Sequence, residues 1–63
     1  MMTSLEKKNG AVGIYIIYED LNGPVAVCAT KQAGRDWLLN NGWAEDEADL
    51  AENFSFIWEE IIY

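Results

Sequence analysis

The sequence contains no histidine, one cysteine and only four basic residues among its 63 residues. Without histidine it lacks the side chain that most often acts as a general acid or base at neutral pH, and also the commonest metal ligand. The single cysteine, Cys28, cannot form a disulfide within the chain, and it stands in an apolar segment with no evident base beside it. We therefore expect a protein that is not an enzyme and that needs no cofactor or metal ion.

Basic residues are outnumbered by eleven carboxylates, which gives a net charge of −7. Recognition of nucleic acid depends on Lys and Arg side chains that neutralise phosphates, and anionic membranes attract the same residues. Direct binding to nucleic acid or to a membrane is therefore disfavoured. A basic protein surface is the favoured partner, because opposite charges steer the encounter.

Long apolar segments are also missing. The longest apolar run, Ile14–Tyr18, falls far short of the about 20 residues that span a bilayer. Residues 1–10 hold no apolar stretch of the kind that signal peptides contain. Together with the lone cysteine, these features predict a cytoplasmic protein.

Three segments have the composition of strands, after a flexible lead over residues 1–10. Val12–Glu19 and Phe54–Tyr63 are rich in β-branched and aromatic residues, which favour strands. Val25–Ala29 is a shorter apolar segment that follows the turn signal Asn22-Gly23. The first two strands are therefore expected to form a hairpin.

A helix is expected over Lys31–Asn41, between the second and third strands. Thr30 is a suitable N-cap, and Gly42 fits the left-handed residue that follows many helices. Its expected apolar stripe consists of Ala33, Trp37 and Leu38. Gly34 is expected to allow close approach of a strand, because it has no Cβ atom.

The order of elements predicts the α+β fold class with a ββαβ pattern, as one domain over residues 11–63. We expect a three-stranded antiparallel sheet in the order 2-1-3, with the first strand central and one helix on one face. Residues 45–52 fit either a short second helix or an acidic loop.

This sheet would have more apolar surface than one helix can cover, because the first strand is apolar on both faces. A large uncovered apolar patch usually marks an interface. The candidate dimer face consists of several of Tyr15, Ile17, Ile57, Ile61 and Tyr63, or of the alternate residues of the same strands. The other interpretations are that this face or its edge strands bind a target directly, or that the lead or the acidic segment folds over this side.

The acidic segment after the helix is the candidate partner-binding surface. It contains Glu45, Asp46, Glu47, Asp49 and Glu52, with Trp43 as a flanking aromatic anchor. Carboxylates at high density could occupy a Lys- and Arg-lined groove that otherwise holds DNA or RNA phosphates. Glu19, Asp20, Glu59 and Glu60 could extend this surface. A plain solvated segment that keeps a small hydrophobic protein soluble is the alternative.

The arrangement of Gly13-Ile-Tyr-Ile-Ile-Tyr18, a hairpin, Val25–Thr30, a capped helix and an aromatic last strand resembles small acidic accessory proteins of bacteriophages and mobile elements. That group includes inhibitors of host defence such as anti-CRISPR proteins. The resemblance implies an inhibitor that acts in the host cytoplasm on a basic surface of a host protein, such as a nucleic-acid-binding groove. It rests on no signature motif and assigns no residue. A homodimeric structural or regulatory protein and an oligomeric small-ligand trap are the alternatives.

Overall fold

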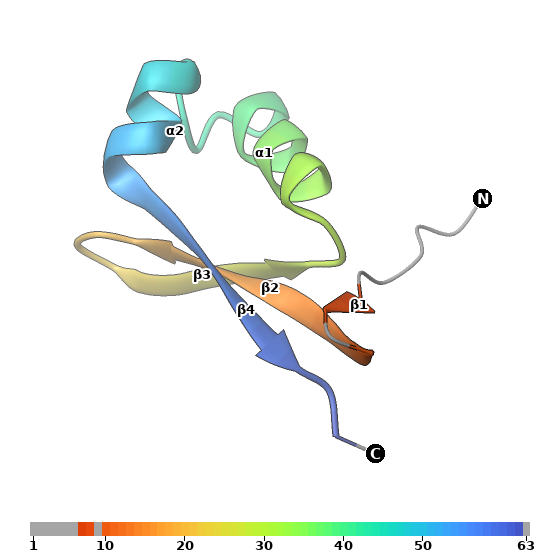
Figure 1. Cartoon of the computed structure of the whole chain (residues 1–63). Helices are drawn as coiled ribbons and strands as arrows, with labels where there is room; N and C mark the ends of the chain where they lie inside the picture. Colours follow the sequence, from red (N-terminus) through yellow and green to blue (C-terminus); the bar gives the residue numbers. More distant parts are fainter. Residues whose placement is uncertain (1–6, 9, 63) are drawn as a thin grey trace.

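The computed structural model describes residues 7–8 and 10–62, and it has an α+β fold in which two helices lie on one side of an antiparallel sheet (Figure 1). In chain order the elements are β1 (Lys7–Lys8), β2 (Ala11–Glu19), β3 (Gly23–Cys28), α1 (Lys31–Asn40), α2 (Glu47–Asn53) and β4 (Phe54–Glu60).

The sheet is built around β2, which pairs antiparallel with each of the other strands. β3 and β4 flank it, which confirms the predicted central place of the first long strand. The short strand β1 pairs with the start of β2 and was not predicted, since it consists of two lysines from the expected lead. The sheet therefore has four strands rather than three.

Helix α1 begins and ends as its cap residues predict. The Thr30 side chain accepts a hydrogen bond from the Ala33 N–H at 3.1 Å. At the other end Gly42 has a φ of +76°, and the N–H of Trp43 donates to the Leu38 carbonyl at 2.9 Å. The first bond satisfies an N–H and the second a carbonyl that the helix itself leaves without partners.

The buried side of α1 differs from the predicted stripe. Gly34 and Leu38 are buried, whereas Ala33 is exposed and Trp37 is 40% exposed. The helix is rotated because Gly34 allows the backbone to approach the sheet, with Cys28 and other side chains against it. The prediction was wrong for Ala33 and Trp37 and was right for Leu38 and Gly34.

A second helix, α2, forms in the segment for which the sequence analysis predicted either a short helix or an acidic loop. It lies on the same side of the sheet as α1 (Figure 1). Its buried residue Leu50 joins the core with Ile17, Leu38, Ala44 and Phe54. The acidic segment therefore does not cover the second side of the sheet. Residues 1–6 of the lead lie outside the described residues.

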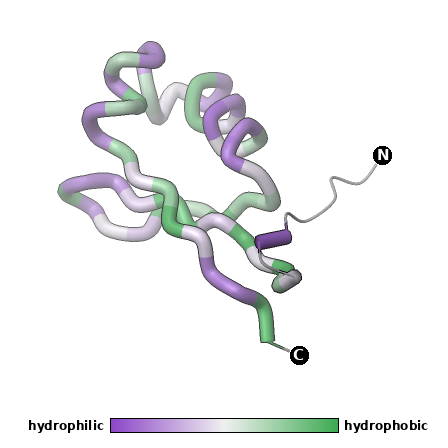
Figure 2. The backbone as a smooth tube through the Cα atoms, in the orientation of Figure 1, coloured by the Kyte–Doolittle hydropathy of each residue, from purple (hydrophilic) through white to green (hydrophobic). Residues whose placement is uncertain are grey.

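Alternate residues of β2 divide clearly between the two sides. Tyr15 and Ile17 are 3% and 1% exposed under the helices. They are therefore not part of an uncovered face, and the candidate dimer face was wrong at these two positions. Cross-strand pairing instead puts Ile57 opposite Ile16 and Trp58 opposite Tyr15, so Ile57 lies on the uncovered side. Hydrophobic residues follow the strands, and hydrophilic residues mark the β2–β3 turn (Figure 2).

Candidate functional site

Two acidic segments far apart in the sequence meet at one end of the molecule. The end of β2 carries Glu19 and Asp20, and α2 carries Asp49; all three border one hollow of about 220 Å³. The hollow is completed by the following side chains: Leu21, Asn22, Trp43, Asn53 and Phe54. We call the carboxylates at this end the acidic end: Glu19, Asp20, Glu45, Asp46, Glu47, Asp49 and Glu52.

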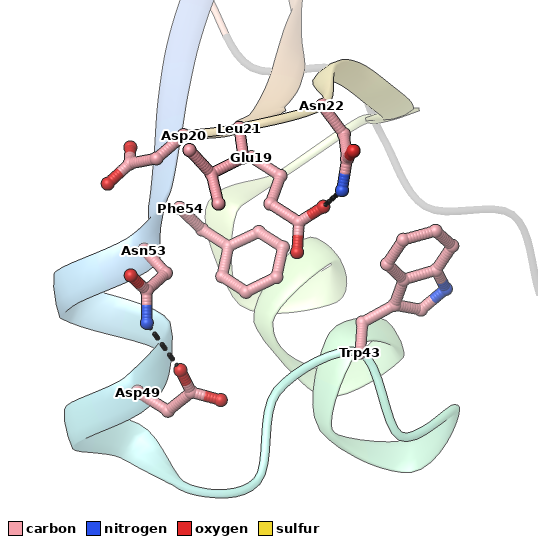
Figure 3. Close-up of a pocket in the computed structure, with 8 residues that line it drawn as sticks. All are labelled: Glu19, Asp20, Leu21, Asn22, Trp43, Asp49, Asn53 and Phe54. Carbon is pink, nitrogen blue, oxygen red and sulfur yellow. Dashed lines mark hydrogen bonds between the residues drawn. The ribbon is translucent and has the colours of Figure 1, made fainter.

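Backbone pairing fixes this meeting of segments. Glu19 pairs with Phe54 at the junction of α2 and β4, and the Asp20 N–H donates to the Asn53 carbonyl at 3.0 Å. In the close-up the Glu19 carboxylate lies between the rings of Phe54 and Trp43, while Asp20 points away (Figure 3). Glu19 also accepts a hydrogen bond from the Asn22 side chain.

Two carboxylates of the acidic end cap α2. The Asp46 side chain accepts from the Asp49 N–H at 2.8 Å, and Asp49 accepts from the Glu45 N–H at 2.9 Å. Asn53 donates to the other oxygen of Asp49 at 2.6 Å. The Glu45 N–H and then Asn53 hold the pKa of the Asp49 carboxyl below its usual value, against a small opposing effect of desolvation. Asp49 is thus a poor proton donor or acceptor near neutral pH.

The remaining predicted carboxylates differ in their engagement. Glu47 forms an ion pair with Arg35, which links α2 to α1. Within residues 7–8 and 10–62, the side chains of Glu45 and Glu52 have no hydrogen-bond or ion-pair partner, and both are exposed. The Asp20 side chain is likewise exposed and without such a partner among these residues, so these three carboxylates offer their charge to a partner at no structural cost.

Trp43, which the sequence analysis expected to be a flanking anchor, lies beside the acidic end. It is 42% exposed, and its ring stacks on Trp37 with a centroid distance of 6.0 Å. The two stacked rings lie at the C-terminal end of α1, next to the acidic end. The role of Trp37 was not predicted, because the helical spacing alone placed it in the core.

The cations lie mostly away from this end. The ammonium groups of Lys8 and Lys31 are 5.1 Å and 5.7 Å from the centroid of the Tyr15 ring. Glu60 pairs with Gly13, whereas Glu19 pairs with Phe54, so about 20 Å of strand separates the two carboxylates. Glu59 and Glu60 therefore do not extend the acidic end, while Glu19 and Asp20 do.

The uncovered side of the sheet is a second candidate surface, which we call the open face. Its members are Lys7, Val12, Ile14, Ile16, Tyr18, Pro24, Val27, Ser55, Ile57, Glu59 and Ile61, as the strand register assigns them. Val27 is 63% exposed and Ile57 is 45% exposed. Tyr63, also predicted for this face, lies outside the described residues. No described helix crosses this side (Figure 1).

The described residues offer little else that could act chemically. Cys28 is half-buried against the core, as expected for a small apolar side chain. Residues 7–8 and 10–62 bring together no three metal-ligating side chains, and none of their helices is long and apolar enough to cross a membrane. Comparison of the chain with models of protein families, with curated proteins and with solved structures gives no match, so the resemblance to phage accessory proteins stays a prediction.

Proposed function

We propose that this protein is a non-enzymatic binding protein whose acidic end docks onto a basic surface of another protein. The observation that carries the proposal is the convergence of Glu19 and Asp20 with Asp49 of α2 around one hollow that Trp43 also lines. Seven carboxylates of the described chain lie at this end, and Arg35 is the cation paired with one of them. Such a surface steers a basic partner and repels nucleic acid.

The position of the charges on two elements supports a particular kind of partner. A groove that binds DNA or RNA presents Lys and Arg side chains to a row of phosphates. Carboxylates on α2 and on the β2 end offer negative charge from two elements, with an aromatic anchor between them. We propose that the protein occupies such a groove and inhibits its owner, as a phage-encoded inhibitor of a host defence or nucleic-acid-handling protein would.

Capture of a partner from a bacterial lysate, followed by salt elution, tests the proposal. Binding at about 50 mM salt should be lost by about 500 mM, because the Debye length falls from about 14 Å to about 4 Å. The captured partner should be a nucleic-acid-binding protein. Adding the 63-residue protein should displace nucleic acid from that partner.

A matched pair of charge variants distinguishes binding through the acidic end from binding through net charge alone. Glu45→Lys with Glu52→Lys changes the charge from −7 to −3, since each substitution adds two units. Asp36→Lys with Glu60→Lys makes the same change outside the acidic end. The first variant should lose capture and the second should keep it. Equal loss in both would attribute binding to net charge, and unchanged capture by the first would exclude this surface.

A further inference from the structure

The open face carries an inference that is independent of the acidic end. We propose that it is the interface of a homodimer, in which two copies stack face to face. The face is apolar along its centre, with Val12, Ile14, Ile16 and Tyr18 of β2 in line. Its charges stand at the flanks, where Lys7 lies opposite Val12 and Glu59 lies opposite Ile14.

The positions of Lys7 and Glu59 favour a second copy of the chain as the partner that covers the open face. Lys7 and Glu59 lie on different edges of β2, and they form no ion pair within the described part of the chain. A two-fold axis that runs along β2 exchanges the edges. Lys7 of each copy then lies on the same side of the dimer as Glu59 of the other copy. Along β2 the two side chains are offset by the step from Val12 to Ile14. Sheets stack about 10 Å apart, a gap that the long arms of Lys and Glu can close from both sides.

The alternative two-fold axis, which runs across the strands, is disfavoured by the same charges. It would lay Glu59 of one copy over Ile57 of the other and leave a carboxylate against apolar side chains. Burying a carboxylate without a partner is costly. The axis along β2 pairs every charge of the face and stacks the apolar rows on each other.

The net charge of the chain does not oppose this arrangement. Both helices lie on the covered side of the sheet, so the carboxylates of α2 point outward from the dimer (Figure 1). Two sheets and two helix layers keep the α2 carboxylates of the copies well beyond the Debye length of about 8 Å at physiological salt. Their mutual repulsion is therefore screened.

The size of the face sets the expected affinity. From Val12 to Tyr18 it runs about 20 Å, and three strands give it a width of about 14 Å. This footprint is smaller than the about 800 Å² per partner of a standard interface, so we expect dissociation in the micromolar range. The dimer should therefore be populated at about 100 μM and dissociate well below about 1 μM.

Sedimentation equilibrium of the full chain over this concentration range tests the proposal. The expected mass at high concentration is twice the 7.1 kDa of the chain. Ile57→Lys should remain monomeric, whereas Leu21→Lys, at a 95% exposed leucine off the face, should dimerise like the wild type. A monomeric wild type at about 500 μM, or an Ile57→Lys variant that dimerises normally, would overturn the proposal.

Exchange of the charges tests the orientation. Lys7→Glu and Glu59→Lys should each weaken the dimer by about tenfold, because each replaces two attractive contacts by repulsive ones. The double variant restores opposite charges and should recover most of the affinity. Both residues are exposed, and circular dichroism checks that the variants fold. A double variant as weak as the single variants would refute the proposed axis.

Discussion

A Cβ atom added to Gly34 would lie 2.7 Å from Cε2 of Phe56, closer than real Cβ contacts allow. The same atom would meet the Cys28 Sγ at 2.7 Å. Gly34 is thus the point at which α1 touches the sheet, with Phe56 on one side and β3 on the other. The contact sets both the distance of the helix from the sheet and its rotation.

Gly34→Ala is therefore expected to destabilise the protein although alanine is the better helix former. The propensity gain is about 1 kcal/mol, whereas forcing a methyl group into a packed contact typically costs about 1–3 kcal/mol. Urea unfolding should show a net loss of up to about 2 kcal/mol, the difference between these two effects. Ala33→Gly, at the exposed neighbouring position, serves as the control for propensity alone and should cost about 1 kcal/mol. A stabilised Gly34→Ala variant would contradict the observed packing.

The same contact shows why the sequence predicted the helix but not its orientation. Thr30 and Gly42 define the ends of α1 by local chemistry, which a sequence displays. The side that faces the sheet depends on the close approach at Gly34. Because of that approach, Trp37 turns outward and stacks on Trp43, which lies beyond the helix end. A spacing rule that assigns large apolar residues to the core cannot anticipate this.

The sequence predicted the order of the long strands in the sheet, but not which face of the sheet the helices cover. Both faces of β2 are apolar, so alternation alone does not say which residues the helices bury. Cross-strand register with β4 decides it, since Phe56 and Trp58 share a side with Ile17 and Tyr15. The large aromatic side chains of β4 could have indicated this side, because aromatic rings supply large apolar surfaces to a core.

The acidic end shows what sequence spacing can and cannot reveal. The Asp46-Glu47-Ala48-Asp49 spacing resembles a capping box, and it could have favoured the helix over the loop. The approach of Glu19 to this segment depends on the antiparallel pairing of β2 with β4. The sequence predicted that these strands pair, but not the register that puts Glu19 opposite Phe54 at the end of α2.

Gly42→Ala should destabilise α1 through the backbone alone. Nothing lies within 4 Å of an added Cβ, but the φ of +76° is one that residues with a side chain rarely adopt. The expected loss is about 1 kcal/mol, measured by urea unfolding. Gly42→Asn should lose less, since asparagine tolerates this conformation better. An alanine variant as stable as the wild type would mean that the turn forms in another way.

Trp37 and Trp43 should be energetically coupled. A stacked aromatic pair contributes about 0.5–1.5 kcal/mol beyond the surface that it buries. We expect a double-mutant cycle of Trp37→Ala and Trp43→Ala in thermal unfolding to give a coupling free energy in this range. A cycle with Trp37→Ala and Trp58→Ala is the control and should be close to additive, because Trp58 lies against Gly13 of β2 and takes no part in the Trp37–Trp43 stack.

Asp49 should make the stability of the protein depend on pH in the acidic range. Its pKa is lowered in the folded chain because its carboxylate accepts hydrogen bonds from the Glu45 N–H and the Asn53 side chain. A carboxyl with a lowered folded pKa contributes stability that is fully present above its unfolded pKa of about 3.9 and is lost as the pH falls through the folded pKa.

Asp49→Asn should consequently be less stable than the wild type at pH 7, and the difference should shrink below about pH 4. The Asn side chain keeps one oxygen acceptor and loses the other. It can therefore accept only one of the two bonds, from the Glu45 N–H or from Asn53, that Asp49 accepts in the wild type. Urea unfolding at pH 7 and at about pH 3 measures the difference. Glu52→Gln removes a carboxylate without a partner in the same helix, within the part of the chain that the structure describes, and should change stability little at either pH. If the difference between Asp49→Asn and the wild type stayed constant with pH, the Asp49 carboxylate would not stabilise α2 through its charge.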